Sequence, residues 1–160
     1  MTEQSTGRDE QGVSQFVERF AAVLVEAGFS RMAARVFVAL LASESGRLTA
    51  AELAERLQAS PAAISGAVRF LVQVNLISRL REPGSRRDSY LVDDDVWFVV
   101  IERRLNAITR WGDQMAAGIE AVGGKDSEAG ARLTDMVAFF EFMRDEMPAV
   151  MKRWHDLKPK

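Results

Sequence analysis

The chain has 160 residues, enough for one domain or for two small lobes that share a core. It has no cysteine and a single histidine, His155, which excludes disulfides, thiolate metal sites and multi-histidine metal clusters. The formal net charge is −2, yet residues 60–92 carry a local excess of three positive charges, all from arginine. A basic patch on an acidic body favours a local anionic partner.

The N-terminal segment MTEQSTGRDEQG is polar, so we expect a disordered tail over 1–12 and no signal peptide. The apolar run VWFVVI at 96–101 ends at Glu102, far short of a membrane span. Hydrophobic residues make up 48% of the chain, as in ordinary soluble globular proteins. These features predict a cytoplasmic protein without membrane contact.

Apolar residues three and four positions apart predict an amphipathic helix over 13–27, which Gly28 ends. Ser30 is a suitable cap for a second helix that ends near Gly46. A very short strand is expected directly afterwards, at 47–48.

Two capped helices follow. Thr49 and Glu52 have the spacing of a capping box, which predicts a short helix over 50–57. Two residues later, Ser60-Pro61 places a capping side chain before a proline at the first helical position, and this predicts a helix over about 61–74. Asn75 then stands where a left-handed residue is wanted.

Short β-rich runs at 76–82 and 88–92 flank Pro83-Gly84, a pattern typical of a β-hairpin. Strand alternation puts Arg79 and Arg81 on one face, and the turn carries the two remaining arginines of this segment to the tip. The hairpin is therefore strongly basic.

Two long helices complete the chain. Asp93–Asp95 favour a helix start by capping and by the helix dipole, and Gly123-Gly124 end that helix. Its apolar stripe passes through either Trp111 or Gly112. The last helix begins near Asp126, and Pro148 is expected to kink or interrupt it.

Helix, short helix, tight turn, capped helix and hairpin form the order of a winged helix-turn-helix. In that motif the second helix enters the major groove of DNA with its N-terminal residues facing the bases. A basic hairpin tip suits the negative potential of a narrow minor groove. The predicted DNA contacts are Ser60, Ala62, Ala63, Ser65, Arg69, Arg79, Arg81, Arg86 and Arg87.

The sequence gives little indication of metal binding or catalysis. Helix capping explains the three aspartates better than a metal site does, and no nucleophile motif accompanies the single histidine or Ser65-Gly66. We therefore expect no enzyme activity, no metal and no cofactor.

Residues LTAAELAERLQASPAAISGAVRFLVQVNLISRLREPGSRRDSYLV (48–92) resemble the DNA-binding core of the MarR family of bacterial transcriptional regulators, and the flanks extend this resemblance to about 13–155. The likeness is to the mycobacterial branch that represses lipid-exporting efflux pumps. It implies an obligate homodimer with interleaved terminal regions, a wing arginine in the minor groove, and a small-molecule pocket between the two lobes.

The wing departs from the family pattern Asp-x-Arg, because Ser85 stands at the aspartate position before Arg87. Asp88 is a candidate substitute carboxylate. Either Arg86 or Arg87 enters the groove, and we favour Arg87.

Methionines and aromatic residues in the last two helices suit a dimer core, and some suit an adaptable apolar pocket. The pocket candidates are Phe29, Met32, Met136, Phe139, Phe140 and Met143.

The sequence thus predicts a mainly α fold with a small β-hairpin wing, with a DNA-binding domain over 30–94 and a helical dimerisation region over 13–29 and 95–155. The predicted function is a homodimeric, ligand-responsive regulator that binds a pseudo-palindromic operator in double-stranded DNA. It would be associated with the nucleoid and would repress nearby transport, efflux or stress genes. An apolar effector would bias the dimer toward a spacing that no longer matches the operator. The alternative is a winged-helix module that binds another protein and has no sequence-specific DNA binding.

Overall fold

A computed structural model describes residues 8–81, 87–93 and 95–157. The chain divides into two compact units, an N-terminal unit of Met1–Val96 and a C-terminal unit of Trp97–Lys160. Each unit is described by itself below.

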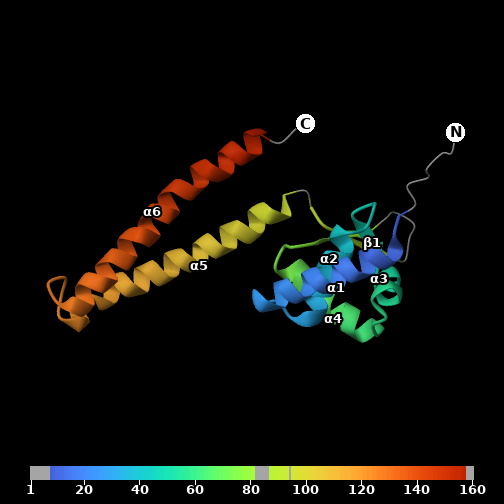
Figure 1. The fold of residues 1–160 in the computed structure, drawn as a ribbon, viewed down its shortest axis with the longest axis horizontal. Helices are drawn as coiled ribbons and strands as arrows, with labels where there is room; N and C mark the ends of the chain where they lie inside the picture. Colours follow the sequence, from blue (N-terminus) through green and yellow to red (C-terminus); the bar gives the residue numbers. More distant parts are fainter. Residues whose placement is uncertain (1–7, 82–86, 94, 158–160) are drawn as a thin grey trace. The chain divides into compact units, whose positions relative to one another are not determined.

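The N-terminal unit is built on four helices, three of which pack against the fourth, α2 (Figure 1). They are α1 (Glu10–Glu26), α2 (Arg31–Leu41), α3 (Ala50–Leu57) and α4 (Pro61–Gln73). Helix α2 packs against each of the other three. Its Phe37 and Leu40 are fully buried together with Leu53 of α3 and Ile64 and Leu71 of α4. The apolar stripes that predicted these helices therefore meet in one core.

The first helix begins earlier than predicted. Glu10 to Gly12 belong to α1, because the Asp9 side chain accepts a hydrogen bond from the backbone N–H of Gly12 (2.9 Å) and caps the first turn. The predicted disordered tail over 1–12 is therefore wrong for these residues, and positions 1–7 lie outside the described residues.

The second helix ends earlier than predicted, at Leu41 instead of near Gly46. The buried Ser43 hydroxyl donates to the carbonyl oxygen of Leu40 (2.8 Å), which satisfies a carbonyl of the last turn where the helix stops. Gly46 then turns the chain with a φ of +63°. Ser30 occupies the N-cap position of α2, but its side chain makes no capping hydrogen bond.

Three short strands form an antiparallel sheet in the order β1-β3-β2. They are β1 (Arg47–Thr49), β2 (Ser78–Arg81) and β3 (Asp88–Leu91). In this register Arg79 of β2 lies opposite Tyr90 of β3, and Thr49 of β1 lies opposite Ser89. The predicted hairpin and short strand are confirmed. Together with α3 and α4 they make a winged helix-turn-helix, as predicted.

The C-terminal unit is a hairpin of two long helices, α5 (Val96–Gly118) and α6 (Glu128–Leu157), joined through a 3-10 turn at Glu120–Val122 (Figure 1). Val96 is assigned to the N-terminal unit although α5 begins there. Gly123 and Gly124 follow the 3-10 turn with positive φ, as expected for the end of a helical segment.

Two predictions about these helices need correction. Helix α5 ends at Gly118, four residues before Val122. Helix α6 continues through Pro148, so the expected interruption there is wrong, whereas the alternative of a kink stays a prediction. A proline removes only one backbone donor, so the hydrogen bonds on either side of it still continue the helix.

The side chain of Asp93 differs from the expectation that it caps α5. The Asp93 carboxylate accepts a hydrogen bond from the Ser78 hydroxyl (2.7 Å), and the Asp93 carbonyl oxygen accepts from the N–H of Val96 (3.0 Å). The side chain of Asp93 therefore anchors the end of the sheet. Asp94 lies outside the described residues.

Helices α5 and α6 approach closely at Gly112, which is buried. A methyl group at Gly112 would lie 3.3 Å from the Cβ of Phe140. The apolar stripe therefore passes through Gly112, and Trp111 is 58% exposed.

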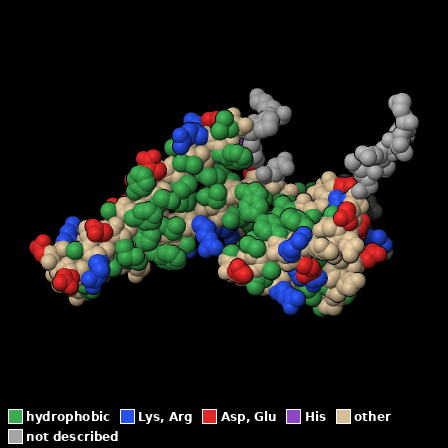
Figure 2. Space-filling model, in the orientation of Figure 1, with side chains coloured by type: hydrophobic (Ala, Val, Ile, Leu, Met, Phe, Trp, Pro, Cys, Tyr) green, Lys and Arg blue, Asp and Glu red, His purple; other side chains and the backbone are tan. Residues whose placement is uncertain are grey.

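Apolar side chains remain uncovered along the C-terminal unit (Figure 2). Among its described residues only Gly112, Ile119 and Gly130 are buried. The most exposed large apolar residues are Trp111, Phe139, Phe142, Trp154 and Leu157. An exposed apolar surface of this kind marks an interaction site. Across the described residues, no helix combines the length and the apolar character needed to cross a membrane.

Candidate nucleic-acid interface

The start of α4 is fixed by its local sequence. The Ser60 hydroxyl accepts a hydrogen bond from the N–H of Ala63 (3.2 Å), and Pro61 occupies the first helical position. The turn from α3 passes through Gln58, which adopts a left-handed conformation with a φ of +48°. These features set the direction in which α4 leaves the turn.

The capping box of α3 is complete. The Thr49 hydroxyl accepts from the N–H of Glu52 (3.2 Å), and the Glu52 carboxylate accepts from the N–H of Thr49 (2.7 Å). The backbone and side-chain hydrogen bonds from Thr49 hold the pKa of Glu52 below its ordinary value, because they stabilise the charged form.

One face of α4 is free of the protein core. Ala62, Ser65, Gly66, Arg69 and Gln73 are exposed and follow the helical repeat. A methyl group at Gly66 would meet no atom within 4 Å, so this part of the helix is open. Ala63, a predicted contact, is half-buried toward the edge of this face. Gln73 was missed, although its spacing of four from Arg69 places it on the same face.

Arg69 and Ser65 are close neighbours on α4. The Arg69 Nη2 lies 3.5 Å from the Ser65 hydroxyl oxygen, which is a long hydrogen bond. Both predicted contacts therefore project from one turn of the helix.

The sheet presents a second group of charges. Arg79 of β2 donates to the Asp88 carboxylate of β3, and the two side chains form an ion pair. That hydrogen bond, and then the positive charges of Arg79 and Arg81, hold the pKa of Asp88 below its ordinary value. The same contact raises the pKa of Arg79.

A groove of about 430 Å³ separates α4 from the sheet. It brings three predicted residues together, Ser65 and Arg69 from the helix and Arg79 from β2. Its other lining residues are Val68, Val72, Asp88 and Tyr90. Sequence reasoning did not identify Asp88 and Tyr90 as groove residues, because their position depends on how β3 pairs with β2.

The remaining wing arginines are only partly described. Arg81 and Arg87 are exposed, whereas Arg86 and Ser85 lie outside the described residues. Asp88 forms an ion pair with Arg79, and the suggestion that it replaces the wing aspartate stays a prediction. The choice between Arg86 and Arg87 for the minor groove stays a prediction.

The six predicted pocket residues are divided between the units. Phe29 and Met32 lie in the N-terminal unit, where the Phe29 ring centroid is 6.3 Å from that of Phe37. The other four lie on α6, where the ring centroids of Phe139 and Phe140 are 5.8 Å apart. The predicted pocket stays a prediction.

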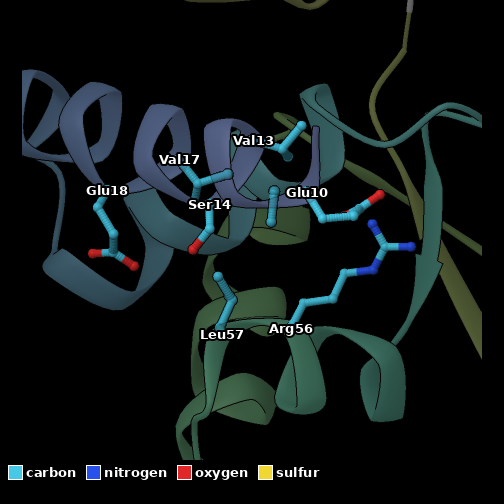
Figure 3. Close-up of a pocket in the computed structure, with 8 residues that line it drawn as sticks. Glu10, Val13, Ser14, Val17, Glu18, Arg56 and Leu57 are labelled. Carbon is cyan, nitrogen blue, oxygen red and sulfur yellow. The ribbon is translucent and has the colours of Figure 1, made fainter. Parts of the chain in front are cut away.

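A different cavity, of about 160 Å³, lies between α1 and α3 (Figure 3). Val13 and Val17 of α1 and Leu57 of α3 form its apolar part, and Glu10 and Arg56 lie at one end. None of the six predicted pocket residues lines it.

Two family models match the chain. A model described as the MarR family matches residues 27–88, and one described as an MmpR5-like MarR family transcriptional regulator matches residues 95–157. Among curated proteins, the chain is 26% identical over 145 residues to the HTH-type transcriptional regulator MmpR5 of Mycobacterium tuberculosis, with 91% of this chain and 88% of that protein covered.

Solved structures are also similar to this chain. The crystal structure of a transcriptional regulator matches with a TM-score of 0.75 and 26% identity, over 91% of this chain and 99% of that one. MepR, a transcription regulator of the Staphylococcus aureus multidrug efflux pump MepA, matches with a TM-score of 0.42 and 18% identity, over 92% of each chain.

Proposed function

Because this chain belongs to the MarR family of transcriptional regulators, and is therefore a regulator and not an enzyme, we propose that it binds double-stranded DNA through α4 and the wing. The observation that carries this proposal is the groove in which Ser65 and Arg69 of α4 face Arg79 of the sheet. Arginine and serine are common partners of base edges and phosphates.

In this proposal α4 enters the major groove with Ala62, Ser65 and Gly66 toward the bases. The small side chains permit close approach, and Arg69 reaches a guanine or a phosphate. The exposed Ser60 and the half-buried Ala63 lie at the N-cap and in the first turn of α4, whose N–H groups attract phosphate. The wing arginines, among them Arg81 and Arg87, contact the backbone and the adjacent minor groove.

We further propose that the functional form is a homodimer joined through the C-terminal unit. Supporting this, the unit leaves large aromatic side chains such as Trp111, Phe139 and Phe142 exposed. Two-fold symmetry then predicts a pseudo-palindromic operator whose half-sites lie about 34–36 Å apart. The assignment of 13–29 and 95–155 to dimerisation and of 30–94 to DNA binding belongs to this proposal.

The proposed outcome is repression of nearby genes, because a dimer on a promoter blocks access of the transcription machinery. The family resemblance suggests transport, efflux or stress genes as targets, with action in the cytoplasm at the nucleoid. An apolar effector would relieve repression if it bound the form that does not fit the operator more tightly than the form that does.

Fluorescence anisotropy with duplexes from the upstream region of this chain's own gene tests the proposal. Affinity should fall steeply with salt, and Arg69→Ala and Arg87→Ala should both weaken binding. Arg31→Ala, which removes an exposed arginine of α2, is the matched control. If the wild-type protein binds none of these duplexes, the interaction-module alternative is favoured.

A further inference from the structure

An acidic side chain stands on the surface proposed to face DNA. Asp88 lines the groove between α4 and the sheet and pairs with Arg79 of the neighbouring strand. The Arg79 side chain is 57% exposed and that of Asp88 is 23% exposed. Arg79 is therefore the more solvent-exposed member of the pair, and Asp88 is the more buried one.

The charges around this pair are unequal. Among the described residues that line the groove, the charged ones are Arg69, Arg79 and Asp88. Arg81 also acts on Asp88 electrostatically. The Asp88 carboxylate repels phosphate. It also pairs with the Arg79 guanidinium, which would otherwise be available to bind a phosphate.

Fold stability offers only a small reason for such a pair. An exposed ion pair contributes about 0–1 kcal/mol in general. The effect of this carboxylate on DNA binding is distinguishable from its effect on stability, since one phosphate contact changes the slope of log affinity against log salt by about 0.9.

We propose that Asp88 is a positioning residue that sets DNA specificity: it holds Arg79 along the wall of the groove and withholds it from phosphates. Sequence-independent affinity is thereby lowered, and the contacts of α4 with the bases carry a larger share of binding. The inference rests on the proposed function and deepens it, because it changes the predicted role of Arg79 from a direct contact to a restrained one.

The test compares wild type, Asp88→Asn, Arg79→Gln and the double variant on two probes. One probe is a 30-base-pair duplex of random sequence, and the other is a duplex that the wild-type protein selects from a random library. Glu44→Gln removes one exposed negative charge elsewhere in the N-terminal unit and is the charge-matched control. Dissociation constants are measured between 0.05 and 0.2 M KCl, with thermal unfolding in parallel.

In Asp88→Asn, freed Arg79 should add one phosphate contact per bound protomer, which steepens the salt slope by about 0.9. Between 0.05 and 0.2 M KCl, the affinity of Asp88→Asn should therefore fall by a factor about 3.5 times larger per protomer than the affinity of wild type falls. Affinity for the random duplex should rise more than affinity for the selected one, and Arg79→Gln should remove the effect.

An unchanged slope, an equal change in Glu44→Gln, or a change that persists in the double variant would overturn the inference. Equal weakening on both probes together with a lower unfolding temperature would also overturn it, because Asp88 would then only stabilise the hairpin. Failure of the wild-type protein to bind either probe would overturn the proposed function itself, and the inference with it.

Discussion

Arg35 of α2 donates a hydrogen bond from its Nη2 to the backbone carbonyl oxygen of Leu57, 2.9 Å away, at the C-terminal end of α3. The same guanidinium pairs with Glu18 of α1, with a shortest distance of 2.6 Å. One side chain thus joins three helices just before the turn into α4. The Arg35 side chain is only 19% exposed, so solvent screens this contact less than an ion pair at the surface.

Replacing this residue should destabilise the N-terminal unit. Arg35→Met keeps much of the aliphatic stem but leaves the Leu57 carbonyl oxygen without its donor, which costs about 1–2 kcal/mol. The lost ion pair with Glu18 adds little to this cost, because the Glu18 side chain is half-exposed. Urea unfolding at a fixed protein concentration measures the difference, since a dimer's stability depends on concentration. Arg31→Met, which replaces an exposed arginine in the first turn of α2, is the control, and equal midpoints for both variants would contradict the prediction.

The capping box of α3 predicts that the stability of the N-terminal unit decreases at acid pH. The folded-state pKa of Glu52 is held below its ordinary value of 4.5, so its charged form stabilises α3. That contribution is fully present above about 4.5 and is lost as pH falls through the lower folded-state pKa. Glu52→Gln should therefore be less stable than wild type at pH 7, and the difference should shrink below pH 4.5.

Urea unfolding at several pH values measures this change. Thr49→Ala removes the other half of the box and should cost about 1 kcal/mol at neutral pH. Glu55→Gln, an exposed acid on the same helix, controls for the loss of charge alone. A gap between wild type and Glu52→Gln that is constant with pH would count against the assignment.

Local signals were sufficient to predict much of the surface proposed to bind DNA. The capping box of Thr49 and Glu52 and the pair Ser60-Pro61 act within one helical turn, so sequence alone located α3 and α4. Asn75 adopts the expected left-handed conformation for a similar reason.

Contacts between distant residues could not be predicted. The partner of Arg35 lies 22 positions away along the chain, and the ion pair between Arg79 and Asp88 depends on how two strands pair. Asp93 was assigned to a helix cap by its position, whereas its carboxylate binds Ser78, 15 positions earlier. Each of these contacts forms only when distant segments of the N-terminal unit have packed together.

Gly130 in the first turn of α6 should not tolerate a side chain. A methyl group there would overlap the carbonyl oxygen of Gly124 and crowd the Ser127 hydroxyl, which accepts a hydrogen bond from the Gly130 N–H (2.9 Å). Gly130→Ala should cost about 1–3 kcal/mol through this overpacking. Gly118→Ala is the control, because a methyl group at that position meets no atom within 4 Å. Thermal unfolding by circular dichroism compares the two, and equal unfolding temperatures would refute the prediction.

Replacing Gly66 with alanine should weaken DNA binding without lowering the stability of the fold. Gly66 lies on the open face of α4, where a methyl group meets no protein atom within 4 Å. Alanine is a better helix former than glycine by about 0.5–1 kcal/mol, so Gly66→Ala should unfold at an equal or higher temperature. The added methyl group occupies the face proposed to meet the bases and should weaken binding to a selected duplex by about tenfold, which corresponds to about 1.4 kcal/mol. Gly118→Ala adds the same group in the other unit and should leave DNA affinity unchanged. Anisotropy and thermal unfolding of both variants provide the comparison, and wild-type affinity in Gly66→Ala would show that this face of α4 does not approach the DNA.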